Sequence, residues 1–145
     1  MVVAWLLSLG LAGAMELRLE LPPQVAVDPL RPEELAPAVA VPWEGGEAPW
    51  VPVVERRLPS AFRVWVPKGA SLAAFDVEAR VLGSGLRAEG QPSRIPAKVR
   101  VEGLRLVARN PDGDLWEGDL VLSLDVSRAL AGSFSGTLQV TLSGR

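Results

Sequence analysis

Three oxygen-bearing side chains in the stretch NPDGDLWEGD have a spacing that could bind a metal ion. Asn110, Asp112 and Asp114 stand at alternate positions, and such a spacing can gather oxygen ligands around calcium. An EF-hand loop would place glycine at its sixth position and glutamate at its twelfth, where this sequence has Leu115 and Val121. A metal site here would therefore be a calcium loop of another kind.

The same stretch has a simpler structural explanation. Pro111, Asp112 and Gly113 have the conformational preferences of turn residues, and strand-like segments lie on both sides of them. We therefore predict a hairpin turn whose acidic side chains face solvent, and we expect neither a bound metal nor a cofactor.

Two tryptophans flank a Gly-Gly turn in the stretch WEGGEAPW. The indoles of Trp43 and Trp50 could stack on a sugar ring or contact a protein partner, as large aromatic side chains do at binding sites. The alternative is that both rings fill the core or cover a sheet edge, because the chain has five tryptophans and only three phenylalanines. We prefer the alternative, and we assign Trp65 and Trp116, which lie in strand-like segments, to the core as well.

The side chains that most enzymes use are missing. The chain has no histidine and no cysteine, which excludes a Ser-His-Asp triad, a thiolate nucleophile and metal sites built from imidazole or thiolate. None of the possible carboxylate pairs stands apart from the charged face of a strand, as a glycosidase pair would. The net charge of -2 is spread along the chain and forms no basic stripe. We therefore predict a protein that is not an enzyme and does not bind nucleic acid.

Proline limits the elements in the first half of the chain. Residues 22–59 hold nine of the thirteen prolines, each of which removes a backbone donor from a sheet. We expect only short or edge strands here, around residues 24–27, 38–41 and 50–57. The stretch RPEEL predicts a single helical turn that begins at Pro32.

Apolar and charged residues alternate regularly after residue 61, which is typical of antiparallel strands with one face in the core. Gly103 predicts a bulge within one long strand, and SRALAG predicts a short helical turn closed by Gly132. The expected strands cover residues 62–66, 75–81, 95–109, 120–126 and 133–144. Together these patterns predict one all-β domain, an antiparallel sandwich of seven to nine strands of immunoglobulin-like or pilin-like type.

The first fourteen residues have the pattern of a secretory signal peptide. An apolar run from Val2 to Leu11 is followed by Ala12-Gly13-Ala14, which fits the small residues of a cleavage site, although no basic residue precedes the run. The run is too short to cross about 30 Å of hydrocarbon as a helix, so we expect no permanent membrane anchor. We predict a signal peptide at 1–14, a single sandwich domain at 15–145, and export to the periplasm, cell surface or medium. The alternative is a strand or helix of a cytosolic protein.

The C-terminal stretch SRALAGSFSGTLQVTLSG resembles the end of secreted bacterial pilin-type sandwiches, including spore coat protein U-like subunits. The residues that carry this resemblance are Ala131, Gly132, Phe134, Gly136, Thr137, Val140 and Leu142. The resemblance implies a non-catalytic surface subunit that assembles by strand exchange, in which the N-terminal segment of one subunit completes the sheet of its neighbour.

The segment MELRLEL has the form of such a donor strand, because Met15, Leu17, Leu19 and Leu21 alternate with charged residues. The alternative, which we prefer, is that it pairs within its own domain. We therefore expect an exported structural or surface protein that contacts itself or other envelope proteins through strand addition. The alternative function is a carbohydrate-binding module that uses Trp43 and Trp50.

Overall fold

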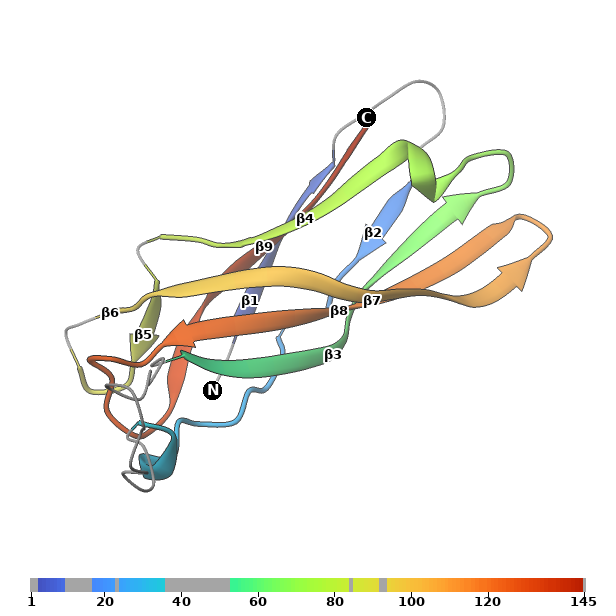
Figure 1. Ribbon diagram of the computed structural model, residues 1–145. Coiled ribbons are helices and arrows are strands. Elements are labelled where there is room, and N and C mark those ends of the chain that lie inside the picture. Colours follow the sequence, from blue (N-terminus) through green and yellow to red (C-terminus); the bar gives the residue numbers. More distant parts are fainter. Residues whose placement is uncertain are drawn as a thin grey trace, which may run out of the picture.

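The computed structural model describes residues 3–9, 17–22, 24–35, 53–83, 85–91 and 94–144. These residues form an all-β sandwich of two sheets, as predicted (Figure 1). One sheet has the strand order β1-β9-β5-β6, with β4 also paired to β9, and the other has the order β2-β3-β8-β7. Every strand pairing is antiparallel except that of β1 with β9, which is parallel.

The strands and the two short 3-10 helices have the following bounds: β1 Val3–Leu9, β2 Arg18–Glu20, η1 Pro32–Glu34, β3 Val53–Pro67, η2 Leu72–Ala74, β4 Phe75–Val81, β5 Leu86–Ala88, β6 Arg94–Ile95, β7 Ala97–Asn110, β8 Gly113–Asp125 and β9 Phe134–Gly144. Neither of these helices, nor any other helix in the described ranges, is long and apolar enough to cross a membrane.

The core lies between the sheets and follows the alternation in the sequence. Leu120, Leu122 and Leu124 of β8 and Leu138 and Val140 of β9 are all 0% exposed. Burying one such side chain contributes about 1.5–3 kcal/mol relative to leaving it in water. The predicted inward faces of these two strands are therefore confirmed.

Strand β3 is longer than the sequence predicted, because it joins the segments expected at 50–57 and 62–66 into one bent strand. The pairing of β3 with β8 shifts register between Leu58 and Phe62, which leaves Pro59, with no backbone N–H, outside the ladder. Ser60 within this bulge has a φ of 51°, the only positive value at a non-glycine residue in the described ranges. Just beyond it, Phe62 lies opposite Gly118 of β8.

Strand β1 lies within the segment predicted to be a signal peptide. Its seven residues pair with β9 from Val3 opposite Gly136 to Leu9 opposite Leu142. In this structure the segment is therefore a strand of the first sheet, which is what the alternative of a cytosolic protein predicts. Export and cleavage stay predictions.

Local expectations had mixed outcomes. The 3-10 turn at Pro32–Glu34 and the irregular pairing after Glu102 confirm the helical turn at Pro32 and the bulge at Gly103. Residues 24–27 form no strand, and SRALAG forms a turn followed by an isolated bridge from Gly132 to Leu30, not a helical turn. No strand was expected between residues 81 and 95, where the structure has the short strand β5 and the first residue of β6.

Candidate functional site

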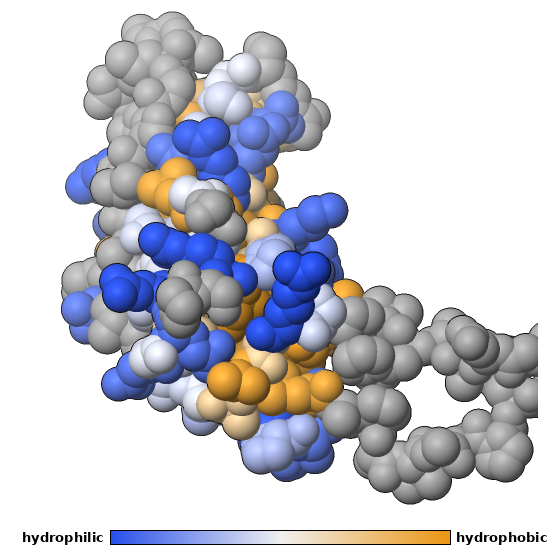
Figure 2. Space-filling view, turned by 90° about the vertical axis from the view of Figure 1, so that its left-hand side faces the viewer, coloured by the Kyte–Doolittle hydropathy of each residue, from blue (hydrophilic) through white to orange (hydrophobic). Residues whose placement is uncertain are grey.

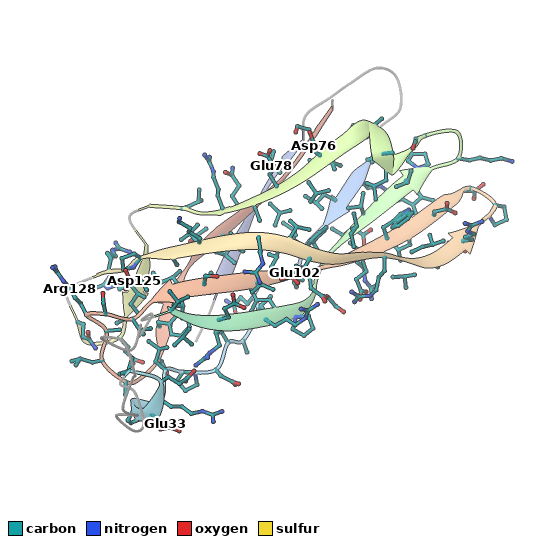
Figure 3. The ribbon with its side chains drawn as sticks, viewed as in Figure 1. Glu33, Asp76, Glu78, Glu102, Asp125 and Arg128 are labelled. Atoms are coloured by element: carbon teal, nitrogen blue, oxygen red, sulfur yellow. The ribbon has the colours of Figure 1, made fainter. Side chains whose placement is uncertain are left out.

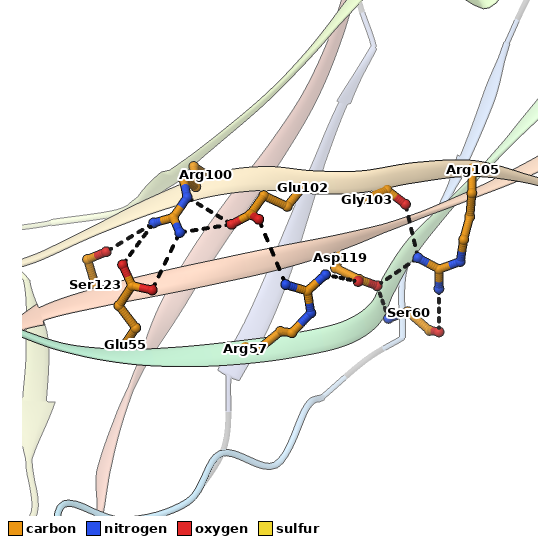
Figure 4. Close-up of polar contacts among 9 residues, drawn as sticks. All are labelled: Glu55, Arg57, Ser60, Arg100, Glu102, Gly103, Arg105, Asp119 and Ser123. Carbon is orange, nitrogen blue, oxygen red and sulfur yellow. Dashed lines mark hydrogen bonds and ion pairs between the residues drawn. The ribbon is translucent and has the colours of Figure 1, made fainter.

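A row of charged side chains crosses the outer face of the second sheet, and Figure 4 shows most of it. Glu117 and Asp119 stand on the central strand β8 and are only 7% and 5% exposed. Carboxylates are seldom buried without partners. The partners of Glu117 and Asp119 come from β3 and β7, which lie on either side of β8. This charged row comprises Glu55, Arg57, Ser60, Arg63, Arg100, Glu102, Arg105, Glu117 and Asp119.

Asp119 accepts hydrogen bonds from three groups. The backbone N–H of Ser60 donates to Oδ1 at 2.7 Å, Arg57 donates to Oδ2 at 2.7 Å, and Arg105 donates to Oδ1 at 3.1 Å. Because Arg57 comes from β3 and Arg105 from β7, this one carboxylate joins three strands. Such charge-assisted bonds are stronger than neutral ones.

Glu117, which lies two residues before Asp119 on β8, also accepts hydrogen bonds from arginines and from Ser60. Arg105 donates to its Oε1 at 2.6 Å, Arg63 donates to its Oε2 at 3.2 Å, and the Ser60 hydroxyl also donates to Oε1. Arg105 therefore bridges Glu117 and Asp119, and Ser60 contacts both of them through two different groups. The bulge in β3 is what brings Ser60 to this position.

The charged row continues over the exposed end of the face. The guanidinium of Arg100 contacts Glu102 at 2.8 Å and Glu55 at 3.3 Å. Arg57 lies 3.8 Å from Glu102 and so connects this part of the row to Asp119. These outer pairs are about half exposed, and such pairs contribute at most about 1 kcal/mol each.

The two buried carboxyl groups of the row are held in their ionised form. The Ser60 hydroxyl and then Arg105 lower the pKa of Glu117, against burial, which acts to raise it. Burial is the largest influence on Asp119 and acts to raise its pKa, but the hydrogen bonds from Ser60, Arg57 and Arg105 together lower it. A general acid at neutral pH needs a raised pKa, so neither group is suited to that role.

The charged row is electrically balanced, because four arginines face four carboxylates. No group of three or more His, Asp or Glu side chains that could share a metal ion occurs in the described ranges. The row can therefore fix the register of β3, β7 and β8, and it offers no surplus charge to a ligand.

The candidate calcium ligands lie at the hairpin that joins β7 to β8. Asn110 pairs with Gly113, which confirms the predicted hairpin turn at Pro111 and Asp112. Asp114 lies opposite Arg109 across the ladder. The carboxylate of Asp114 thus has a cationic neighbour in register.

The four tryptophans that the sequence analysis assigned have different outcomes. Trp43 and Trp50 lie outside the described residues. Trp116 is half-buried and packs against the core. The core prediction for Trp65 is wrong: its neighbours Val64 and Val66 are buried, so Trp65 stands half-buried on the outer face. A Cβ at Gly113 would approach the Trp65 ring to 2.8 Å, so the indole packs over this glycine.

The proposed donor segment pairs within its own chain over its described part. Met15 lies outside the described residues, Leu17 and Leu19 are buried, and Leu21 is half-buried against the core. Only β2, three residues long, pairs with β3. The described part of the segment therefore pairs within its own domain, as the preferred alternative predicted.

A second surface of interest is the edge of β9. On one side β9 pairs with β4 and β5, and on the other side its pairing partner is β1. The β1 pairing covers Gly136 to Leu142 without a register shift. Among the described residues, β1 is the strand that covers this edge of β9.

In comparisons with known protein families, with curated proteins and with solved structures, nothing matches this chain.

Sequence reasoning missed the charged row. The alternation of charged residues at Arg100 and Glu102 was visible within the strand expected at 95–109. Glu117 and Asp119, in contrast, were assigned to a solvent-exposed turn before the strand expected at 120–126, whereas both lie buried on β8. What the sequence lacked was the bulge at Ser60, which brings a backbone donor to Asp119. That donor is separated from its acceptor by 59 positions.

Proposed function

We propose that this chain is an exported, non-catalytic structural or surface subunit that acts through protein–protein contacts, with the edge of β9 as the surface that accepts a strand. One observation carries the proposal: β1, the strand that covers this edge, lies within the segment predicted to be removed as a signal peptide. Cleavage after Ala14 would leave β9 with a free edge.

The geometry of β9 supports this role. β9 is 11 residues long and its pairing with β1 is regular, so an exposed β9 edge would present an ordered row of backbone donors and acceptors. The other edges are poorer templates, because β2 and β6 have only three and two residues and β7 has two register shifts. β4 faces β7 of the other sheet.

The N-terminal segment of a second copy is the occupant that we propose for the edge. In the segment from Met15 to Leu21 every second residue is apolar, as strand addition requires, and only three residue pairs hold it to β3. Leaving its own sheet would expose Leu17 and Leu19, so the exchange must bury equivalent apolar area in the neighbour.

Size-exclusion chromatography of the chain recovered from the envelope of an expressing cell tests the proposal, after its N-terminus has been sequenced. We expect a chain that begins at Met15 and forms concentration-dependent polymers. A synthetic peptide of residues 2–10 should cap β9 and block polymer growth, whereas a scrambled peptide of the same composition should not. A processed chain that stays monomeric at every concentration would rule out strand exchange.

A ligand-binding module is the second candidate, and an open cleft favours it. The cleft lies between β4 and β7, has a volume of about 580 Å³ and is lined by Phe75, Leu104 and Trp116 among others. Ligand sites typically have this size and a largely apolar lining with aromatic rings. Titration with a panel of glycans, followed by tryptophan fluorescence, tests this candidate. A saturable shift in a monomeric protein would favour it over the subunit role.

A further inference from the structure

Three arginines gather at the end of the sandwich where β5, β6 and the connection between β8 and β9 lie. Arg87 is on β5, Arg94 on β6 and Arg128 on the connection, and all three are exposed. No hydrogen bond or ion pair joins these guanidiniums to another side chain among the described residues. Figure 2 looks onto this end, where hydrophilic side chains alternate with apolar patches.

Two of these arginines lie directly opposite each other. In the short β5–β6 ladder Arg87 is the register partner of Arg94. Side chains at opposite positions of an antiparallel pair have Cβ atoms about 4.5–5.5 Å apart, and like charges there destabilise the pair. The charged row neutralises its arginines with carboxylates, whereas this ladder keeps two like charges together. An anion bound nearby would relieve that repulsion.

A pocket of about 390 Å³ lies beside this pair, and both Arg94 and Arg128 line it. Gln91 and Ser127 add polar groups to its wall. Two arginines that line one concavity and have no side-chain partner among the described residues can bind phosphate-type oxyanions through bidentate hydrogen bonds.

The one carboxylate among the described residues that line this pocket already has a role. Oδ1 of Asp125 accepts the backbone N–H of Ser127 at 3.0 Å. Hydrogen bonds from Ser127 are the main cause of a lowered pKa of Asp125, with a smaller effect of Arg128. Figure 3 places Asp125 and Arg128 at this same end. Together with Glu89 on the following turn, Asp125 leaves the three arginines with one positive charge in excess.

We propose that this pocket binds a phosphate-type oxyanion, held by the guanidiniums of Arg94 and Arg128 and attracted also by Arg87. The anion is a free phosphate or the phosphate group of a larger molecule, since the chemistry of recognition is the same. The volume of the pocket leaves room for more than the phosphate itself. This site is independent of the edge of β9.

Isothermal titration of the full chain with inorganic phosphate tests the proposal at low ionic strength. We expect saturable binding that is at least about tenfold weaker in the double variant Arg94→Gln/Arg128→Gln, because each lost guanidinium removes charge-assisted hydrogen bonds. The matched control is Arg18→Gln/Arg109→Gln, which removes two exposed arginines that do not line this pocket. Its affinity should stay within about twofold of the parent.

Two further measurements make the outcome decisive. The lysine variants Arg94→Lys and Arg128→Lys keep the charge but lose the planar fork, so they should fold as the parent does and bind with intermediate affinity. Glycerol phosphate that binds more tightly than inorganic phosphate would identify the ligand as an organic phosphate, and equal affinity would identify it as the free ion. Absence of saturable binding by the parent, or equal weakening in the control, would overturn the proposal.

Discussion

The backbone N–H of Ser60 donates to Oδ1 of Asp119 at 2.7 Å, although the two residues are 59 positions apart. Ser60 lies in the bulge of β3 with a backbone φ of 51°, a value that residues other than glycine seldom adopt. Asp119 is buried on the neighbouring strand and holds two arginines as well. The bulge and the buried carboxylate therefore depend on each other.

Replacing Asp119 with alanine should strongly destabilise the fold. The change leaves the N–H of Ser60 without its acceptor and takes one carboxylate partner each from Arg57 and Arg105. A polar group left unsatisfied at a buried position costs about 1–3 kcal/mol. Urea denaturation of Asp119→Ala measures the difference in the free energy of unfolding. Asp112→Ala, at the exposed hairpin turn, is the control and should change it by less than about 0.5 kcal/mol. Equal effects of the two variants would contradict a stabilising role of the charged row.

The conformation of Ser60 makes a separate prediction. Both Ser60→Gly and Ser60→Ala remove the hydroxyl that donates to Glu117, but only glycine adopts a φ of 51° without a steric cost. The glycine variant should therefore be more stable than the alanine variant by about 1 kcal/mol. In an ordinary strand alanine is the better residue, so the reverse order in thermal denaturation would mean that the bulge does not form.

Gly118 is required by the ring of Phe62. A Cβ at position 118 would lie 2.3 Å from Cζ of Phe62, which is 0% exposed and cannot move into solvent. Overpacking of this kind costs about 1–3 kcal/mol, so Gly118→Ala should lower the melting temperature. The double variant Phe62→Leu/Gly118→Ala should recover part of the loss relative to the sum of the single changes, because the smaller side chain makes room. Strict additivity would show that the two residues do not conflict.

Local patterns in the sequence predicted the sandwich because its strands alternate regularly. The inward positions of Leu120, Leu122 and Leu124 and the turn between β7 and β8 follow from side-chain periodicity and turn chemistry. The charged row was not predictable, because it depends on how β3, β7 and β8 align, and the bulge at Ser60 shifts that alignment. The prediction that Trp65 lies in the core was wrong because it rested on residue type, whereas the alternation with the buried Val64 and Val66 places Trp65 on the outer face.

The salt bridge between Glu34 and Arg56 should make stability depend on pH at the acid end. Arg56 donates to both carboxylate oxygens of Glu34 at 2.7 Å and also to the backbone oxygens of Asp28 and Pro29, so it ties the segment around η1 to β3. The hydrogen bonds from Arg56 are the main reason that the pKa of Glu34 falls to about 2. Since an unpaired glutamate has a pKa near 4.5, folding favours the ionised form.

The direction of the effect follows from this difference. The stabilisation is fully present above the pKa of the unfolded chain and is lost as the pH falls from about 4.5 to about 2, where the folded protein takes up the proton. Because Glu34 is 24% exposed, we expect a loss of only about 1–2 kcal/mol. Chemical denaturation of the parent and of Glu34→Gln between pH 2 and pH 7 measures it. The variant should be less stable than the parent at pH 7 and should approach it near pH 2. Glu33→Gln, the exposed neighbour on η1, should follow the parent at every pH, and a Glu34→Gln curve parallel to that of the parent would show that the bridge does not contribute.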